Sequence, residues 1–469
     1  MRKNSTGIRV LGQVFLWVAT IVVALSLTAC EIRKVSTEEE ETGKQQEQSK
    51  ETPTEQTDAE EDDSATGQEN SDDSLQSSLD SAMWQEDLEQ LKNDITWYNT
   101  SPFQRYGEEA FYSLYQEIYN EIPNLSDEQR EYRFRELIYS IGDGHIDMWT
   151  EHESDLGLPI MIDELKDGFY IVNAIKQYKH LIGERVETIN GMPIDELVAK
   201  LEKISNSENQ YWQRNQAIEK LHYAYFYKLL GIQNSDESVL TVNDKKIAFF
   251  DMIVGYFVME WELPLKVGAI PNGIIKDATI FERPYHHEFL EDGRVLVITF
   301  SSCYYELEDY PLTQFGEDVL AEALEKKPEV LLIDLRDNGG GRASQLYAAF
   351  SERFFTETGF LNNPNFFVAT DSGTFSAGVL TAHVLRGKFG ATLIGTPTGG
   401  SPYTTGVTDT ANKVLKNTGI SFRVSAEKIG KKMIQHPSEL PDYVIEKSSS
   451  DLQAGLDPVI EFVKAALNR

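Results

Sequence analysis

Two glycine-rich turns, each directly after an apolar run, carry the residues best suited to chemistry. The first turn is Gly339-Gly340-Gly341, which follows the apolar run 330–335. Consecutive glycines let the backbone take unusual dihedral angles and bring bare N–H groups close to a ligand. Such groups bind phosphate or stabilise an oxyanion. Neither a Walker lysine nor the Gly-x-Gly-x-x-Gly spacing is present at this turn, so an oxyanion is the favoured ligand.

The second turn places a serine where its hydroxyl is exposed. Ser376 lies between the end of the apolar run 366–370 and the start of an expected helix. The dipole of that helix would lie beneath the hydroxyl. The N–H of Ala377 could then join that of Gly340 to hold a tetrahedral oxyanion. The alternative is that Ser376 only caps the helix, since the pattern is not the Gly-x-Ser-x-Gly elbow.

The elements that position these turns alternate between strand and helix. Strands are expected at 295–300, 330–335 and 366–370, and helices at 312–324, 344–354 and 376–385. Strands separated by helices of this length predict an α/β layer with mostly parallel crossovers. We therefore expect residues 290–469 to form the core that carries the chemistry.

The region before this core divides into two parts. Apolar residues recur at helical spacing over 83–141, with Ser126 or Asp127 as a helix cap, which predicts a helical cap over 81–150. Residues 181–191 are similar to the strand and Asn-Gly turn of peptide-binding PDZ domains. We interpret 151–289 as a PDZ-like, mixed α–β region that includes an aromatic helix over 211–230.

The two turns together resemble the tail-specific and tricorn-core serine peptidases. The pattern is Asp-Leu-Arg-x-Asn-Gly-Gly at 334–340, followed by Thr-Phe-Ser-Ala at 374–377. Similar segments follow in the same order at 394–400, 440–445 and 451–457. The resemblance implies an α/β fold: a crotonase-like ββα core, an N-terminal helical cap and a small PDZ-like subdomain. It also implies that Ser376 is a nucleophile and that the reaction needs no metal or other cofactor.

The resemblance decides how the serine is activated. A hydroxyl is a poor nucleophile unless a base takes its proton. The tail-specific branch uses a lysine at the place that Ser401 occupies here, so a Ser–Lys dyad is absent. The tricorn-like branch uses a histidine from the cap junction, and His145 fits that place between small residues. The implied site is therefore Ser376 and His145, with Ala377 and Gly340 as oxyanion donors.

A catalytic histidine usually needs a group that orients it. The tricorn pattern places a glutamate shortly before the Pro-Asp segment, where Gln435 is the nearest residue here. Glu427 and Glu439 are possible substitutes, and the three stay open. The residue beside the histidine, a serine in the family, is Gly144 in this chain.

The N-terminus carries a secretion signal. Arg2, Lys3 and Arg9 precede an apolar run over 10–29 that ends in Leu-Thr-Ala-Cys, which resembles the bacterial lipoprotein processing box. This predicts a signal peptide over 1–29, a lipidated Cys30 and a membrane anchor, with an uncleaved transmembrane segment as the alternative. The protein should lie on the membrane facing away from the cytoplasm, at the cell surface or in the periplasm.

Charge and cysteine content exclude other classes. The 469 residues include 76 acidic and 43 basic side chains, for a net charge of −33, which argues against nucleic-acid binding. Residues 30–80 are acidic and lack Phe, Tyr and Trp, so we expect a disordered tether. Only two cysteines are present; with Cys30 lipidated, Cys303 in its apolar run is expected to be a buried packing residue.

These observations predict a membrane-anchored, extracytoplasmic serine peptidase that acts on peptide or protein substrates. Two alternatives stay open. One is a catalytically inactive lipoprotein that keeps the peptidase fold and binds peptides or small apolar ligands. The other is an esterase or cell-wall amidohydrolase that uses the same serine. The sequence specifies neither the substrate nor the oligomeric state.

Overall fold

The computed structural model describes residues 79–468 except for 104–105, 154, 234–238, 252–259, 264–282, 305, 403–404, 407–411 and 429–437. The described residues belong to one compact unit. The predicted signal peptide, Cys30 and nearly all of the tether lie outside them. Within the described part of the chain, no helix has both the length and the apolar character that a membrane span needs.

Three helices form at the start of this unit, as the apolar spacing predicts. They are α2 (Ser81–Tyr98), α3 (Glu108–Glu121) and α4 (Asp127–Tyr139). Ser126, one of the two expected caps, is the N-cap of α4. Its hydroxyl accepts a hydrogen bond from the backbone N–H of Gln129, and the Gln129 side chain in turn accepts one from the Ser126 backbone N–H.

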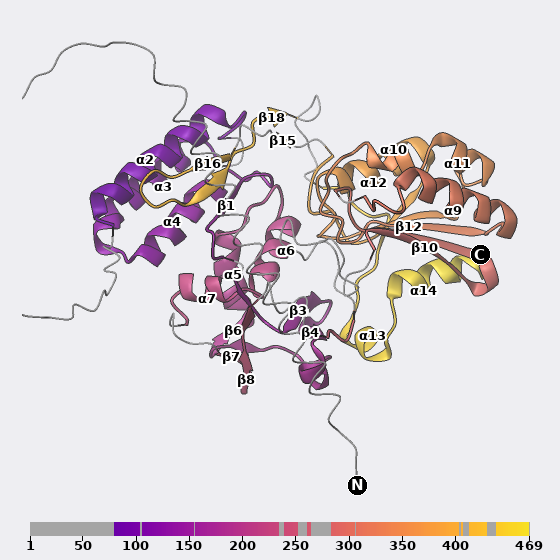
Figure 1. Cartoon of the computed structure of the whole chain (residues 1–469), viewed down its shortest axis with the longest axis horizontal. Coiled ribbons are helices and arrows are strands. Elements are labelled where there is room, and N and C mark those ends of the chain that lie inside the picture. The colour runs from indigo at the N-terminus through magenta and orange to yellow at the C-terminus, as the bar shows by residue number, and fades with distance from the viewer. Residues whose placement is uncertain are drawn as a thin grey trace, which may run out of the picture. The chain divides into compact units, whose positions relative to one another are not determined.

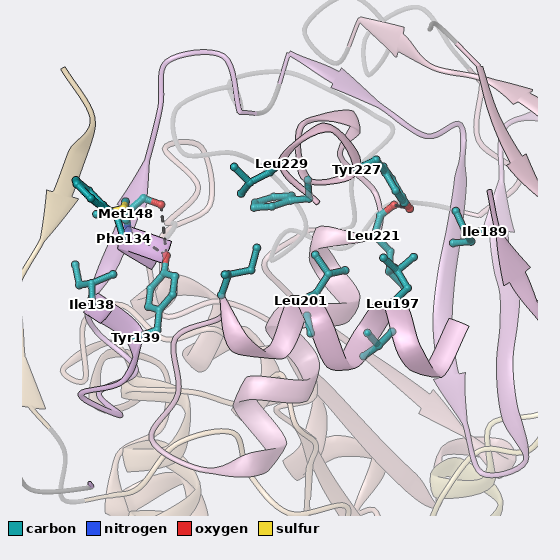
Figure 2. Packing of buried hydrophobic residues seen from close by; sticks show 14 of the residues in the cluster. Phe134, Ile138, Tyr139, Met148, Ile189, Leu197, Leu201, Leu221, Tyr227 and Leu229 are labelled. Atoms are coloured by element: carbon teal, nitrogen blue, oxygen red, sulfur yellow. Dashed lines mark hydrogen bonds between the residues drawn. The ribbon is translucent and has the colours of Figure 1, made fainter. Parts of the chain in front are cut away.

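These helices share one hydrophobic core with the middle of the chain (Figure 2). The middle contributes α5 (Ile194–Lys203), α6 (Gln210–Lys220) and α7 (Ala224–Leu229). Figure 2 shows Leu197 and Leu201 of α5 in this core together with Tyr227 and Leu229 of α7. The core therefore ties the helical cap to the region that follows it.

A segment from late in the chain completes the cap. Strand β1 (Asp147–Trp149) pairs with β17 (Ser421–Arg423), which in turn pairs with β16 (Asn412–Val414). Figure 1 shows β16 beside the N-terminal helices, where the Gln90 side-chain amide donates to the Val414 carbonyl at 2.9 Å. One core thus joins residues from all three regions that the sequence distinguishes.

The middle region contains short antiparallel sheets. Strands β3 (Ile160–Leu165) and β4 (Gly168–Ala174) form a hairpin. A four-stranded sheet has the order β6-β5-β7-β8. Its strands are β5 (Thr188–Ile189), β6 (Met192–Pro193), β7 (Val239–Val242) and β8 (Lys245–Ala248). A separate pair consists of β2 (Leu156–Gly157) and β9 (Phe250–Asp251). Another pair, β15 (Thr405–Gly406) and β18 (Glu427–Lys428), comes from later in the chain. The Asn-Gly turn joins β5 to β6 with positive φ at Asn190 (48°) and Gly191 (78°), as expected for such a turn.

The prediction of a single aromatic helix over 211–230 is wrong, because the chain forms two helices there, α6 and α7. The break lies at His222, whose Nε2 atom accepts a hydrogen bond from the Ile162 backbone N–H at 2.9 Å. The His222 carbonyl also accepts one from the Leu158 N–H at 2.8 Å. These bonds tie the break to the β2–β3 segment, and helical spacing alone cannot reveal them.

A six-stranded sheet forms the second half of the unit, in the order β10-β11-β12-β13-β14-β19. The strands are β10 (Tyr285–Leu290), β11 (Val295–Phe300), β12 (Val330–Asp334), β13 (Phe366–Thr370), β14 (Thr392–Gly395) and β19 (Tyr443–Val444). β10 runs antiparallel to β11, and every other neighbouring pair is parallel. The expected strands and the mostly parallel order are confirmed.

Helices cover both faces of this sheet (Figure 1). One face packs against α9 (Leu312–Lys326), α10 (Gln345–Ala349), α11 (Glu352–Glu357) and α12 (Ala377–Phe389). The other face packs against α14 (Pro458–Ala465), which follows α13 (Ser449–Ala454). Short 3-10 helices lie at Ile122–Asn124, Lys176–Leu181, Glu291–Gly293 and Ala466–Asn468. The α/β fold class is confirmed.

One helix predicted for this half of the unit differs from the structure. The segment 344–354 is not continuous, because Phe350 adopts an extended conformation between α10 and α11. Its ring is fully buried in the core that also holds Phe315 and Phe354. Burial of this side chain requires the chain to leave the helical path there.

Candidate active site

The serine of the second turn stands at the start of a helix in a strained conformation. Ser376 follows β13 and precedes α12, with φ 48° and ψ −118°. Positive φ is uncommon for a residue with a side chain and is typical of turns that expose a nucleophile. Its hydroxyl makes no capping hydrogen bond to α12. The alternative interpretation, that the Ser376 side chain only caps the helix, is therefore wrong.

The hydroxyl of Ser376 instead faces His145. The Ser376 Oγ and His145 Nε2 atoms lie 3.0 Å apart, within hydrogen-bond distance. His145 comes from the loop between α4 and β1, where its backbone N–H donates to Asp143 Oδ1 at 2.9 Å. The imidazole is 11% exposed. The structure thus brings together the two residues that the sequence suggested as nucleophile and base.

An aromatic stack holds the ring of His145. The Phe375 ring lies 4.7 Å from the imidazole, centroid to centroid, and stacks on Trp212 of α6 at 4.0 Å and 12°. This stack leaves no space for a side chain at Gly144. A Cβ atom there would lie 2.6 Å from the Phe375 ring. The glycine that departs from the family's serine therefore makes room for the aromatic ring beside the imidazole.

A carboxylate that sequence reasoning missed orients the imidazole. Glu208 lies in the loop between α5 and α6, and its Oε1 atom is 3.2 Å from His145 Nδ1. Its other oxygen accepts a hydrogen bond from the Ser401 backbone N–H at 3.0 Å. Ser401 occupies the place of the missing lysine. This residue supplies no base, and its N–H instead fixes the carboxylate behind the imidazole.

Three other residues were considered for this orienting role. One of them contacts a different histidine, and the side chains of the other two are not described by the structure. Glu439 contacts a different histidine: its Oε1 atom lies 2.5 Å from His383 Nδ1. Its Oε2 atom also lies 3.5 Å from an Arg386 nitrogen. Gln435 and the side chain of Glu427 lie outside the described residues. The carboxylate shown at His145 is therefore Glu208, which comes before the serine in the chain.

The sequence held a weak signal for this glutamate. Residues 205–209 read Ser-Asn-Ser-Glu-Asn, a polar run between two helices. Such a run predicts a helix cap, and Asn209 does cap α6 by accepting from the Trp212 N–H. Most of the run is nonetheless buried. A buried polar loop is informative, but burial is not visible in one sequence.

The glycine turn lies against the nucleophile, as expected for an oxyanion hole. A Cβ atom on Gly340 would lie 2.7 Å from Ser376 Cβ and 2.9 Å from the Ala377 nitrogen. In this structure, however, the Gly340 N–H already donates to Asn338 Oδ1 at 3.0 Å. Asn338 is fully buried and donates through Nδ2 to the Phe300 carbonyl at 2.7 Å. The predicted Gly340 donor is thus next to the site but engaged with Asn338.

An ion-pair cluster anchors the start of that turn. Arg336 Nη2 lies 2.6 Å from Asp334 Oδ2 and 2.7 Å from Asp457 Oδ2. Burial alone would lower the pKa of Arg336, but the two carboxylates raise it well above its ordinary value. Asp457 caps α14 by accepting from the Val459 N–H. Asp334 and Arg336 therefore tie the glycine turn to the C-terminal helix.

The remaining candidate residues lie elsewhere or have structural roles. Cys303 is fully buried, as expected, and burial raises its pKa to about 11, which disfavours the reactive thiolate. Among the described residues, the one group of three potential metal ligands is Asp143, His145 and Glu208, at the site itself.

The arrangement contains the parts of an acyl-transfer site. A serine hydroxyl faces an imidazole nitrogen, and a carboxylate faces the other nitrogen of the same ring. A glycine turn and the first turn of α12 lie beside the serine. These are the roles of nucleophile, base, orienting group and oxyanion donors, which recur on unrelated folds.

Comparisons with known proteins agree on the fold. Neither the family profiles nor the curated protein sequences that were compared with the chain match it. Solved structures do match, and the expected tail-specific protease-like fold is confirmed at the level of architecture.

Structures of CPAF are among these matches. An alanine-for-serine mutant of CPAF has a TM-score of 0.57 at 12% identity, over 82% of this chain and 96% of that chain. Mature CPAF complexed with lactacystin has a TM-score of 0.56 at 12% identity, over 82% and 98% of the two chains. The photosystem II D1 C-terminal processing protease has a TM-score of 0.38 at 11% identity, over 78% and 93%. At such identity the likeness to CPAF establishes the fold alone.

Proposed function

We propose that the protein is a serine peptidase in which Ser376 is the nucleophile and His145 the general base. The observation that carries the proposal is the 3.0 Å contact between Ser376 Oγ and His145 Nε2. In the first step the hydroxyl attacks a substrate carbonyl and passes its proton to Nε2. The imidazolium then gives this proton to the leaving amine, and water completes the cycle with the same histidine as base.

Glu208 fixes the tautomer that this step needs. Because its carboxylate lies 3.2 Å from Nδ1, that nitrogen carries the ring proton and donates a hydrogen bond to Glu208. The Nε2 atom is then left with a lone pair directed at the serine hydroxyl. When Nε2 takes up the proton, the same carboxylate stabilises the positive charge of the ring. The proposed catalytic triad therefore consists of Ser376, His145 and Glu208, with Glu208 on the loop before α6.

The oxyanion would be held at the junction of the glycine turn and α12. The N–H of Ala377 stands at the first position of that helix, where backbone donors and the helix dipole favour negative charge. The Gly340 N–H would join it by exchanging Asn338 Oδ1 for the substrate oxygen. That exchange costs one internal hydrogen bond, which the stronger bond to an anionic oxygen offsets.

We further propose that Cys30 is lipidated and anchors the enzyme outside the cytoplasm. The support is the processing-box resemblance and the acidic, non-aromatic sequence between Cys30 and the first helix. A Cys30→Ala chain should move from the membrane fraction to the soluble fraction. Retention of this variant in the membrane fraction would contradict the lipid anchor.

The activity is tested by comparing two serines of one loop. Ser376→Ala should abolish cleavage of a peptide library, whereas Ser372→Ala, four residues earlier, should leave it unchanged. Ser372 contacts Asn215 at 3.3 Å rather than the imidazole, so it is a matched control. Equal turnover by wild type and Ser376→Ala would refute the assignment. Ester turnover without peptide cleavage would point to the esterase alternative.

One observation favours the alternative of a binding protein that keeps the peptidase fold. The Gly340 N–H is engaged with Asn338, so the oxyanion site is not preformed on that side. A protein that only binds would fail to react with a fluorophosphonate while still binding peptides. Since mature CPAF has been solved with lactacystin, that compound is a second probe for the same comparison.

A further inference from the structure

The groups around His145 also form a set of metal ligands. Asp143, His145 and Glu208 each offer one ligand atom, and these atoms all lie within 4.8 Å of one another. From His145 Nδ1 the distance is 3.2 Å to Glu208 Oε1 and 3.9 Å to Asp143 Oδ1. Their side chains are only 9–11% exposed. Two carboxylates and one imidazole therefore lie close together with little exposure to solvent.

The spacing suits a tetrahedral zinc ion. With bonds of about 2.0–2.2 Å, two ligands of a tetrahedral zinc lie about 3.4 Å apart. The separation of His145 Nδ1 and Glu208 Oε1 already meets this value. The Asp143 carboxylate must move closer to complete the set, because its Oδ1 atom lies 3.9 Å from Nδ1 and the three ligand atoms lie within 4.8 Å of one another. One nitrogen and two oxygens, with a water molecule in the fourth position, is a ligand set that zinc accepts.

A backbone N–H orients each of the two carboxylates beside the imidazole. The Ser401 N–H fixes one oxygen of Glu208 and leaves the other facing the ring. The His145 backbone N–H fixes Oδ1 of Asp143 at 2.9 Å. A divalent cation would also neutralise two carboxylates that lie close together with little exposure to solvent. Preorientation and charge both favour binding.

We propose that this cluster binds one Zn²⁺ ion and that the bound ion switches the nucleophile off. The inhibition rests on the function proposed above, whereas the binding does not. A neutral imidazole that binds a metal through Nδ1 carries its proton on Nε2. Zinc binding thus moves the ring proton from Nδ1 to Nε2, with no net gain or loss. The Nε2 atom then donates to Ser376 Oγ and cannot accept the serine proton.

The binding is tested first without catalysis. Calorimetric titration of the full-length Ser376→Ala protein with zinc chloride should show one ion per chain. Asp143→Asn, in the same background, should weaken the affinity at least about tenfold, because it keeps the Oδ1 acceptor for the His145 N–H but loses the charge. His383→Gln is the matched control. It removes a histidine that also contacts a glutamate, at 2.5 Å, but belongs to no three-ligand cluster among the described residues. This variant should leave the affinity unchanged.

The regulation is tested in the wild-type serine background. Zinc should slow fluorophosphonate labelling of Ser376, EDTA should restore it, and Asp143→Asn should raise the half-inhibitory zinc concentration by the same factor as in the calorimetry. No zinc binding, equal affinity in Asp143→Asn, or lost affinity in His383→Gln would overturn the proposal. If Asp143→Asn does not fold, Glu208→Gln replaces it in the calorimetry. Absence of labelling without zinc would refute the peptidase proposal and leave the calorimetric result standing.

Discussion

The Nε2 atom of His145 lies 3.0 Å from the Oγ atom of Ser376, although 231 residues separate the two in the sequence. One belongs to the loop after α4, inside the helical cap, and the other to the start of α12. The site therefore exists only when the cap is packed on the sheet half of the unit. A condition that weakens the packing between the helical cap and the sheet half should therefore reduce activity before the cap or the sheet half unfolds.

Glu208 should be essential for the rate but not for folding. Glu208→Gln should lower kcat by about 10²–10⁴-fold with little change in KM, because the amide no longer enforces the tautomer or stabilises the imidazolium. Steady-state kinetics on a peptide substrate measure the effect. Glu202→Gln, on neighbouring α5, is the control, since Glu202 contacts Arg214 rather than the imidazole. A Glu208→Gln enzyme with wild-type kcat would remove Glu208 from the relay.

Gly144 should tolerate no side chain while Phe375 is present. Gly144→Ala places a methyl group 2.6 Å from the Phe375 ring, so the His145 loop or the ring must shift. A displacement of about 1 Å near the base lowers activity by up to about 10²-fold. Adding Phe375→Leu should recover part of the loss, which a double-mutant cycle of kcat/KM measures.

The control for Gly144→Ala lies in α12. A Cβ atom on Gly387 would meet nothing within 4 Å, so Gly387→Ala should leave the rate unchanged. If the double variant is no better than the sum of its two single changes, the steric explanation for the glycine is incorrect.

Arg336 should contribute to stability through its two carboxylates. Arg336→Met leaves Asp334 without its cation in a mostly buried place and releases Asp457, so the free energy of unfolding should fall by about 2 kcal/mol. The value is below that of a fully buried pair because Asp457 is partly exposed. Urea denaturation measures it. Arg353→Met, which breaks exposed ion pairs only, should be indistinguishable from wild type.

His222 should make the protein less stable in mild acid. Burial lowers its pKa to about 4, whereas in the unfolded chain it titrates near 6.5. Between these values the unfolded chain binds a proton that the native state does not, so the free energy of unfolding falls as the pH falls from about 6.5 to 4. At pH 5 the loss from this group is about 2 kcal/mol relative to pH 7.

The measurement is urea denaturation at pH 7 and pH 5. His222→Gln should reduce the difference between the two pH values, and His180→Gln, at an exposed position, should not. An identical pH dependence in wild type and His222→Gln would show that another group titrates.

The sequence predicted the strands and the site pair for physical reasons. β11 and β13 form over the expected residues because their runs are apolar and bounded by turn residues. Ser376 and His145 could be suggested because the local motifs around them resemble those of a known peptidase family. The break between α6 and α7 could not be predicted, since it depends on a hydrogen bond that His222 accepts from a distant strand. Glu208 was missed for the same reason: only the packed fold brings its loop to the imidazole.

The most direct test of the proposed mechanism is the site and rate of fluorophosphonate labelling. Full-length wild-type protein should incorporate one probe molecule, which mass spectrometry should place on Ser376. His145→Gln, which keeps the serine but removes its base, should label far more slowly, by at least about 10²-fold. His145→Gln and wild type should have the same circular dichroism spectrum. Labelling at another residue, or an equal rate in His145→Gln, would contradict the account.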